Sequence, residues 1–302
     1  MILERNGIYV VGRFLKTARI KNEFISDVED PESVLRELKK QNLGADLFTF
    51  WQRYPETEPR FPYHREWDNW AVLPITSYEN WFQHQINNKV RAKVRKAPKL
   101  GVEIKIVPLT DEYIAAVTRI FNETPTRQGK RFAHYGKSFQ DVAAELRTEV
   151  DRTDFIGAFY RGEMIGFTQQ IYIKDGAYPF GGISSVAHRD KSPNNAMLAK
   201  AVEAGASRGS RYLVYGHFDY GTGESGLAEF KIQNGFQKIQ LPRYYVPLTL
   251  KGRVGLTLNL HHGFRGMIPR KLLRGLIAVR KKWYTKRARV AEIRPPEQHS
   301  SG

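Results

Sequence analysis

The spacing of apolar and polar residues divides the chain into a series of predicted helices and strands. The pattern predicts helices at 32–40, 111–122, 138–149, 194–209 and 223–235. It predicts strands at 45–51, 69–74, 102–109, 154–160, 164–173, 175–186, 211–216 and 236–248. Three prolines between Arg53 and Asn69 predict a long irregular loop there. This order of elements indicates an α+β fold built on one mixed central sheet flanked by helices.

A further predicted helix begins at Ser77 and carries an unusual number of cations. Its apolar residues recur every three or four positions from Trp81 to Ala97 and form one stripe. The remaining faces hold cations without an acid among them, namely Lys89, Arg91, Lys93, Arg95, Lys96 and Lys99. These cations repel one another, so two interpretations stay open: a solvated helix face, or one wall of a polyanion-binding groove.

Composition limits the possible chemistry. The 302 residues include no cysteine, which excludes disulfides, cysteine-ligated zinc, iron–sulfur clusters and a thiol nucleophile. His261-His262 stands isolated in the sequence, and H-E-x-x-H, P-loop and G-x-S-x-G motifs are absent, so we expect no metal site.

The net charge of +17 is concentrated near the C-terminus. Residues 251–302 hold 13 Lys and Arg against Glu292 and Glu297, a net charge of +11. A basic amphipathic helix predicted within this tail suits an anionic membrane surface, or docks on the protein's own core; the last residues read as disordered. No signal peptide and no membrane-spanning apolar run is visible, so we expect a cytoplasmic protein, either soluble or peripheral at the inner face of the membrane.

Two polar segments are candidate functional loops. His217 and Asp219 follow the predicted strand at 211–216, where α/β sheets present ligands. Asp219 is the first candidate for a general base and His217 the second; the alternative is a capping aspartate in a turn-forming loop. The segment 122–135 is basic and contains aromatic residues. Its candidates for binding the phosphate of an acceptor are Arg127, Arg131, His134 and Tyr135; the alternative is a charged surface loop.

Three stretches together resemble the FemAB-like branch of the GNAT acyltransferases, the peptidyltransferases and their "acetyltransferase" relatives. They are "WFQHQINNKVRAKVRKAPKLGVEI" at 81–104, "NETPTRQGKRFAHY" at 122–135, and the helix–strand–loop–FK–GF ending at 194–236. The resemblance implies a GNAT-like acyltransferase domain at 106–250. It also implies a partial N-terminal GNAT-like subdomain at 1–105, followed by the basic tail at 251–302.

Two departures from ordinary GNAT enzymes concern the donor. Those enzymes cradle the CoA pyrophosphate with R/Q-x-x-G-x-G/A at a helix N-terminus, where backbone N–H groups meet phosphates. Here "KSPNNA" lacks the central glycine, so a CoA cradle is compromised although an anion can still bind. The donor-binding candidates are Lys191, Ser192, Asn194, Asn195 and Phe230.

The second departure is Lys231, which stands where many GNAT enzymes have a tyrosine that protonates the departing thiolate. The FemAB branch carries this Phe-Lys pair. The resemblance implies that Lys231 stabilises the oxyanion of acyl transfer or contacts a donor phosphate; a surface lysine on an amphipathic helix is the alternative.

These features predict an enzyme that forms an amide bond on an amine of an anionic acceptor. A lipid- or nucleotide-linked cell-envelope precursor is the candidate acceptor. No permanently bound cofactor is expected. Aminoacyl-tRNA is the first expected co-substrate and acyl-CoA the alternative. A non-catalytic GNAT-like module that binds nucleic acid or a membrane surface is a third hypothesis.

Overall fold

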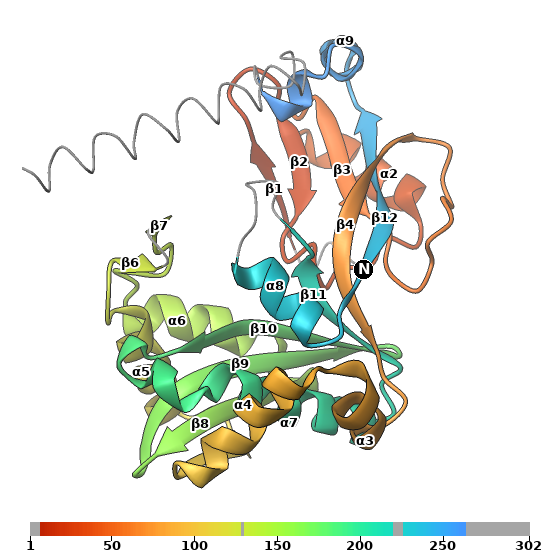
Figure 1. Ribbon diagram of the computed structural model, residues 1–302. Coiled ribbons are helices and arrows are strands. Elements are labelled where there is room, and N and C mark those ends of the chain that lie inside the picture. The colour runs from red at the N-terminus through yellow and green to blue at the C-terminus, as the bar shows by residue number, and fades with distance from the viewer. Residues whose placement is uncertain (1–6, 128–129, 220–225, 264–302) are drawn as a thin grey trace, which may run out of the picture. The chain divides into compact units, whose positions relative to one another are not determined.

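The computed structural model describes residues 7–127, 130–219 and 226–263. These residues form two compact units (Figure 1). Unit 1 comprises Met1–Phe50, Phe61–Arg65 and Tyr244–Gly302, and unit 2 comprises Trp51–Arg60 and Glu66–Arg243. The chain therefore passes from one unit to the other four times, and strands β4 (His64–Pro74) and β12 (Gln237–Pro247) contribute to both.

Unit 1 combines a small sheet with one helix. Its other elements are β1 (Ile8–Val11), β2 (Thr17–Ile20), α2 (Pro31–Gln41), β3 (Leu47–Trp51, of which Trp51 belongs to unit 2), α9 (Leu250–Thr257) and the 3-10 turn η4 (Leu260–His262). β1 pairs antiparallel with β2, and β2 pairs parallel with β3. Helix α2 begins where Asp30 accepts the Ser33 N–H and ends at Asn42 in the left-handed conformation. Its apolar stripe packs on Phe48 and Tyr244.

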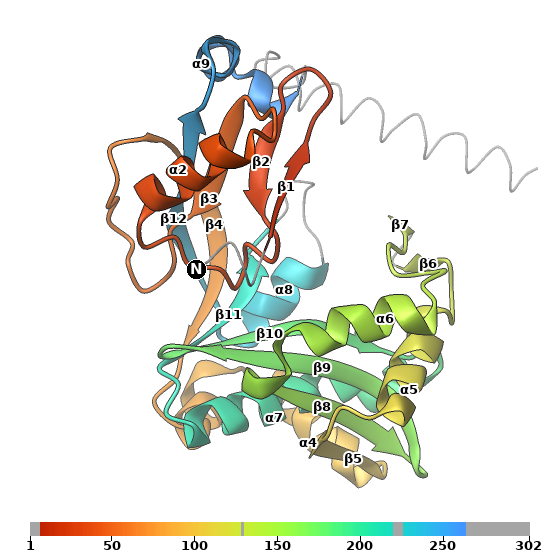
Figure 2. The same cartoon turned by 180° about the vertical axis from the view of Figure 1, so that it is seen from behind.

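Unit 2 is built on a mixed sheet with helices on both faces (Figures 1 and 2). Its strands are β5 (Val102–Val107), β8 (Thr153–Tyr160), β9 (Glu163–Ile173), β10 (Gly176–Ser184) and β11 (Tyr212–His217), in the order β4-β11-β10-β9-β8-β5. Only β10 and β11 pair in parallel among these neighbours. The order and the mixed pairing confirm the predicted GNAT-like α+β fold.

The helices of unit 2 form two layers with separate cores. Helices α4 (Asn88–Lys99) and α7 (Pro193–Ser207) pack on one face, and α5 (Asp111–Phe121) and α6 (Phe139–Leu146) pack on the other. The remaining elements are α3 (Tyr78–Asn80), η1 (Trp81–Gln85), β6 (Thr126–Arg127), β7 (Lys130–Arg131), η2 (Arg147–Arg152), η3 (Val186–Lys191) and α8 (Gly226–Gln233).

The prediction of one continuous helix from Ser77 to Pro98 is wrong. A π-helical turn ends at Gln85, Ile86 is extended, and Asn87 begins α4 by accepting the Val90 N–H. Arg91 stabilises the break, because its guanidinium donates to the carbonyl oxygens of Phe82, Gln83 and Ile86. Paired in this way, Arg91 serves the local fold rather than a polyanion.

The compact units differ from the predicted domain division. Residues on both sides of position 105 lie in unit 2, and residues 244–250 lie in unit 1. Strands β1 and β2 were not predicted, and the loop expected up to Asn69 ends where β4 begins at His64. The predicted basic helix of the tail lies outside the described residues. No helix within the described ranges is long and apolar enough to cross a membrane.

Candidate functional site

A cavity opens where strands β10 and β11 separate. The two strands pair only through Gly176–Tyr212 and Ala177–Leu213, and beyond these residues a cavity of about 210 Å³ lies beside the diverging strands. Its lining comes from β9, β10, α7, β11 and α8: Thr168, Pro179, Gly182, Asn194, Met197, Leu198, Ala201, Tyr215, Gly226, Leu227 and Phe230. The volume is below the about 300–1,000 Å³ of sites for drug-sized ligands, so it suits a small acyl or aminoacyl group.

The predicted donor residues surround the start of α7, but only part of them reaches the cavity. Asn194 and Phe230 line it. Asn195 is buried on the inner face of the helix. Ser192 occupies the N-cap position in the left-handed conformation, and its hydroxyl makes no capping hydrogen bond. Lys191 lies over the Tyr160 ring at 4.8 Å and contacts Asp190.

Lys231 is fully buried in α8 rather than exposed on it. Its ammonium donates to the carbonyl oxygen of His217 and lies 5.4 Å from the centre of the Tyr215 ring, which lines the cavity. Burial lowers the pKa of Lys231 to about 8, and the nearby Asp219 charge opposes this effect. The side chain is therefore predominantly charged at neutral pH inside a poorly solvated site. The surface-lysine interpretation is wrong.

His217 lies at the end of β11 and packs against two indole rings that also contact each other. Its ring centre lies 5.3 Å from that of Trp51 and 5.1 Å from that of Trp70. Nδ1 lies 3.2 Å from the Asn69 carbonyl oxygen, which can only accept a hydrogen bond. The proton of the neutral imidazole therefore lies on Nδ1, which leaves Nε2 as the basic nitrogen.

Asp219 lies two residues further along the chain. Its backbone N–H donates to the Asn69 side chain, and its carboxylate accepts from Lys238 at 2.7 Å. The structure thus brings the three predicted catalytic residues together, with Lys231 bound to His217 and electrostatically coupled to Asp219. The organising residue Asn69, and the aromatic residues around His217, were not predicted.

Glu123 ties the predicted acceptor segment to the turn that precedes α7. Its carboxylate accepts from Ser185 Oγ at 2.8 Å, Val186 N at 2.7 Å and Ala187 N at 3.2 Å. Arg127 pairs with Glu123 and also donates to the carbonyl oxygens of Ser184 and Ile120. Arg127 was predicted to bind the acceptor, whereas these contacts give it a structural role.

The other predicted acceptor residues lie along the same segment, and none is among the residues that line the described cavity. Arg131 and Tyr135 are exposed. His134 stacks on Phe121 with ring centres 4.3 Å apart, and Lys137 contacts its Nδ1. Desolvation, together with the Lys137 charge, lowers the pKa of His134.

Glu123→Gln is expected to lower the free energy of unfolding by about 1–3 kcal/mol at pH 7, because an amide cannot accept all of these hydrogen bonds. Burial raises the pKa of Glu123, but the hydrogen bonds from Val186, Ser185 and Ala187, with the Arg127 charge, outweigh it and hold the pKa below its ordinary value. This stabilisation is present at neutral pH and is lost on acidification through the folded-state pKa.

Urea unfolding of both proteins at pH 7 and at pH 4 checks this expectation, since the difference between them should shrink at the lower pH. Glu145→Gln provides a matched control on an exposed carboxylate and should cost no more than about 0.5 kcal/mol. Equal losses at the two glutamates would contradict the role of Glu123.

The predicted polyanion-binding cations lie mainly on the outer face of α4. Lys89, Lys93, Lys96 and Lys99 are exposed, and none has an ion pair within the described part of the chain. Arg95 lies over the Phe82 ring at 5.2 Å. The exposure of these cations agrees with both interpretations, a solvated helix face and one wall of a polyanion-binding groove.

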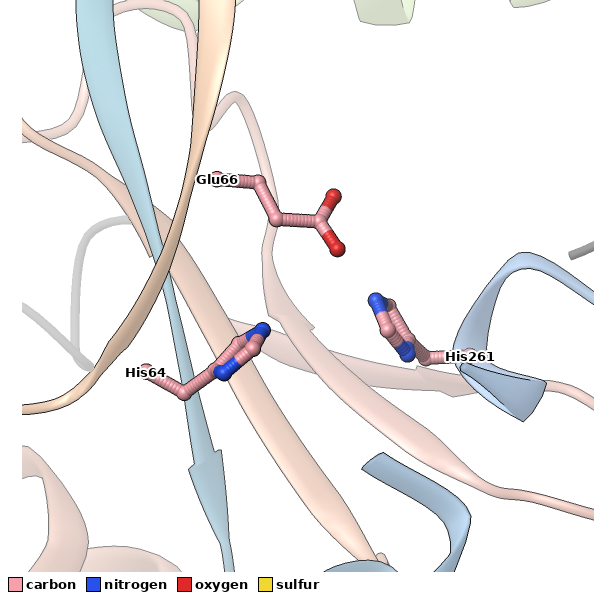
Figure 3. A group of neighbouring side chains, drawn as sticks. All are labelled: His64, Glu66 and His261. Atoms are coloured by element: carbon pink, nitrogen blue, oxygen red, sulfur yellow. The ribbon is translucent and has the colours of Figure 1, made fainter. Parts of the chain in front are cut away.

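His261 is less isolated than the sequence suggests. In unit 1 its ring centre lies 6.2 Å from that of His64, and Figure 3 shows the two side chains. The Tyr245 ring packs on His261 at 4.6 Å, so aromatic contacts within unit 1 hold this histidine.

Comparisons with known proteins agree with the fold. Residues 85–231 match the family model of the acetyltransferase (GNAT) domain. No curated protein sequence matches the chain.

Similar solved structures include FemX, with a TM-score of 0.56 at 12% identity, covering 85% of this chain and 92% of FemX. The C-terminal domain of a putative lysylphosphatidylglycerol synthetase from Agrobacterium fabrum has the same TM-score and identity, covering 86% and 90%. L-PGS from Bacillus licheniformis has a TM-score of 0.52 at 14% identity, covering 86% and 94%. The chain thus carries an acetyltransferase (GNAT) domain at residues 85–231.

Proposed function

We propose that the protein transfers an aminoacyl group from aminoacyl-tRNA to an amine of an anionic acceptor and forms an amide bond. The observation that most supports this proposal is the buried ammonium of Lys231. Only the Tyr215 side chain separates it from a cavity that suits a small acyl group. A charge in this position has little solvent to screen it, so it acts on charge that develops in the cavity.

The reaction follows from these groups without a covalent enzyme intermediate. The acceptor amine attacks the carbonyl carbon of the aminoacyl ester, and the carbonyl oxygen becomes an oxyanion that the Lys231 charge stabilises. Collapse of the intermediate breaks the ester bond and releases the ribose oxygen of the tRNA. Nε2 of His217 or the Asp219 carboxylate accepts the amine proton and returns it to the ribose oxygen as that oxygen leaves.

Two further features favour aminoacyl-tRNA as the donor. The exposed cations of α4 suit a nucleic acid backbone. The turn before α7 lacks the glycine of a CoA cradle, and Ser192 there adopts a positive φ of 58°. The name of the Agrobacterium neighbour describes synthesis of a lysyl derivative of an anionic lipid, which is compatible with aminoacyl transfer. Acyl-CoA remains the alternative donor.

Donor binding is tested by thermal unfolding of the full-length protein with aminoacylated tRNA, deacylated tRNA or acetyl-CoA. A ligand that binds only the folded state raises the Tm. We expect tRNA to raise the Tm, and Lys93→Glu/Lys96→Glu to weaken tRNA binding and flatten its salt dependence, since each lost phosphate contact lowers the slope by about 1.

The control is Lys39→Glu/Lys40→Glu, which makes the same charge change on the exposed face of α2. It should leave tRNA binding nearly unchanged. Stabilisation by acetyl-CoA without any effect of tRNA would overturn the aminoacyl-tRNA proposal and favour acyl-CoA. Stabilisation by none of the three probes would overturn both donors.

A further inference from the structure

Strand β5 forms one edge of the unit 2 sheet. Within the described part of the chain it has a strand neighbour on one side only, β8, with which it pairs antiparallel along its whole length (Figure 2). Backbone N–H and C=O groups on the outer side of such a strand are a template for another strand. The side chains of β5 decide whether such pairing is favoured or opposed.

The two faces of β5 differ sharply in chemistry. Val102, Ile104 and Ile106 point to one face, and Ile106 remains 43% exposed although it is apolar. Glu103 and Lys105 point to the other face, where they form an ion pair with each other. Natural edge strands commonly carry a charge pattern that repels further strands. Opposite charges two residues apart do not have that effect against an identical strand.

Antiparallel pairing of β5 with a second copy of itself has one favourable register. When Ile104 lies opposite Ile104 of the other copy, Glu103 faces Lys105 and Lys105 faces Glu103, while Val102 faces Ile106. Moving the centre to Glu103 or Lys105 places like charges opposite each other, which is destabilising. A shift by one residue places charged side chains on the apolar face.

The surroundings leave room for the apolar side of this pairing. A groove of about 710 Å³ runs beside Val102 and Ile104, with Val94, Pro98 and Ala199 in its wall. The apolar row of a second β5 strand would extend this surface, and its Ile106 would lie beside Val102.

We propose that β5 is a self-pairing edge through which two copies of this chain form a dimer with a continuous sheet across the two-fold axis. The occupant of the edge is a second copy of the chain because, among the registers that keep the apolar residues on one face, the one centred on Ile104 places opposite charges against each other. The dimer is independent of the donor and of the acyl-transfer chemistry.

Sedimentation velocity of the full-length protein tests the proposal. A concentration-dependent dimer is expected at concentrations up to about 100 μM. Lys105→Glu replaces both attractive cross-strand pairs by repulsive ones and should weaken association on the order of tenfold or more. The charge-swapped double variant Glu103→Lys/Lys105→Glu restores both pairs and should restore the dimer.

Arg147→Glu makes the same charge change on the exposed turn η2, where Arg147 pairs with Asp111, and should leave the dimer unchanged. Circular dichroism of each variant identifies a loss of folding. A wild-type protein that stays monomeric throughout this range would overturn the proposal. A dimer insensitive to Lys105→Glu, or one that the double variant does not restore, would also overturn it.

Discussion

Lys231→Met is expected to lower kcat on the order of 10²–10³-fold, with a much smaller change in KM. Methionine fills most of the lysine volume in this fully buried site, but it removes the charge and the hydrogen bond to the His217 carbonyl oxygen. The loss falls on kcat because the oxyanion exists only in the transition state and the intermediate. Steady-state kinetics with the donor identified by thermal unfolding give the measurement.

Alanine is the poorer choice at this position, because truncation of a buried side chain also leaves a cavity. Lys40→Met makes the same substitution at an exposed position of α2 and should keep wild-type kinetics. A Lys231→Met protein that folds and retains wild-type kcat would show that the buried ammonium has only a structural role.

The same lysine is expected to make stability depend on alkaline pH. The folded-state pKa of Lys231 is about 8, well below the ordinary lysine value of 10.5. Between these values the unfolded chain binds more protons than the folded protein, so the free energy of unfolding rises with pH in this window. Over the whole window the free energy of unfolding should rise by about 3 kcal/mol. Below pH 8 this gain is absent, because the folded protein then holds a charged ammonium in a poorly solvated site.

Urea unfolding of the wild type and Lys231→Met at several pH values from 7 to 10.5 isolates this contribution as a difference between the two proteins. The wild type should gain stability relative to the methionine variant as the pH rises. A constant difference would show that the pKa of Lys231 is the same in both states, and the ammonium would then not be in a poorly solvated site.

The local elements of the fold were predictable because their signals lie within a few residues. Asp30 and Pro31 mark the start of α2, Asn42 marks its end, and the apolar pattern locates the strands of unit 2. The break before α4 was missed because the apolar stripe continues through it. The hydrogen bonds of the Asn87 and Arg91 side chains end the first helical segment there, and the spacing of apolar residues gives no sign of these bonds.

The site was predictable as a set of residues, but the environment of each residue was not. Lys231 looks like a surface residue because a lysine on a short helix is normally solvated, whereas its partner here is a carbonyl oxygen on β11. Arg127 looks like a ligand-binding cation because the carbonyl of Ser184 that holds it is remote in the sequence. No role was predicted for Glu123 in the 122–135 segment, because its partners Ser185, Val186 and Ala187 are also remote in the sequence.

The most direct test follows label from radioactive aminoacyl-tRNA into an amide product, with nucleotide-linked and lipid-linked amines as acceptors. Mild alkali hydrolyses the remaining ester and leaves the amide, so alkali-stable label counts transfer. We predict that the wild-type protein produces alkali-stable label and that Lys231→Met produces it on the order of 10²–10³-fold more slowly. Equal rates for the two proteins, or amide formation from acyl-CoA alone, would contradict the account.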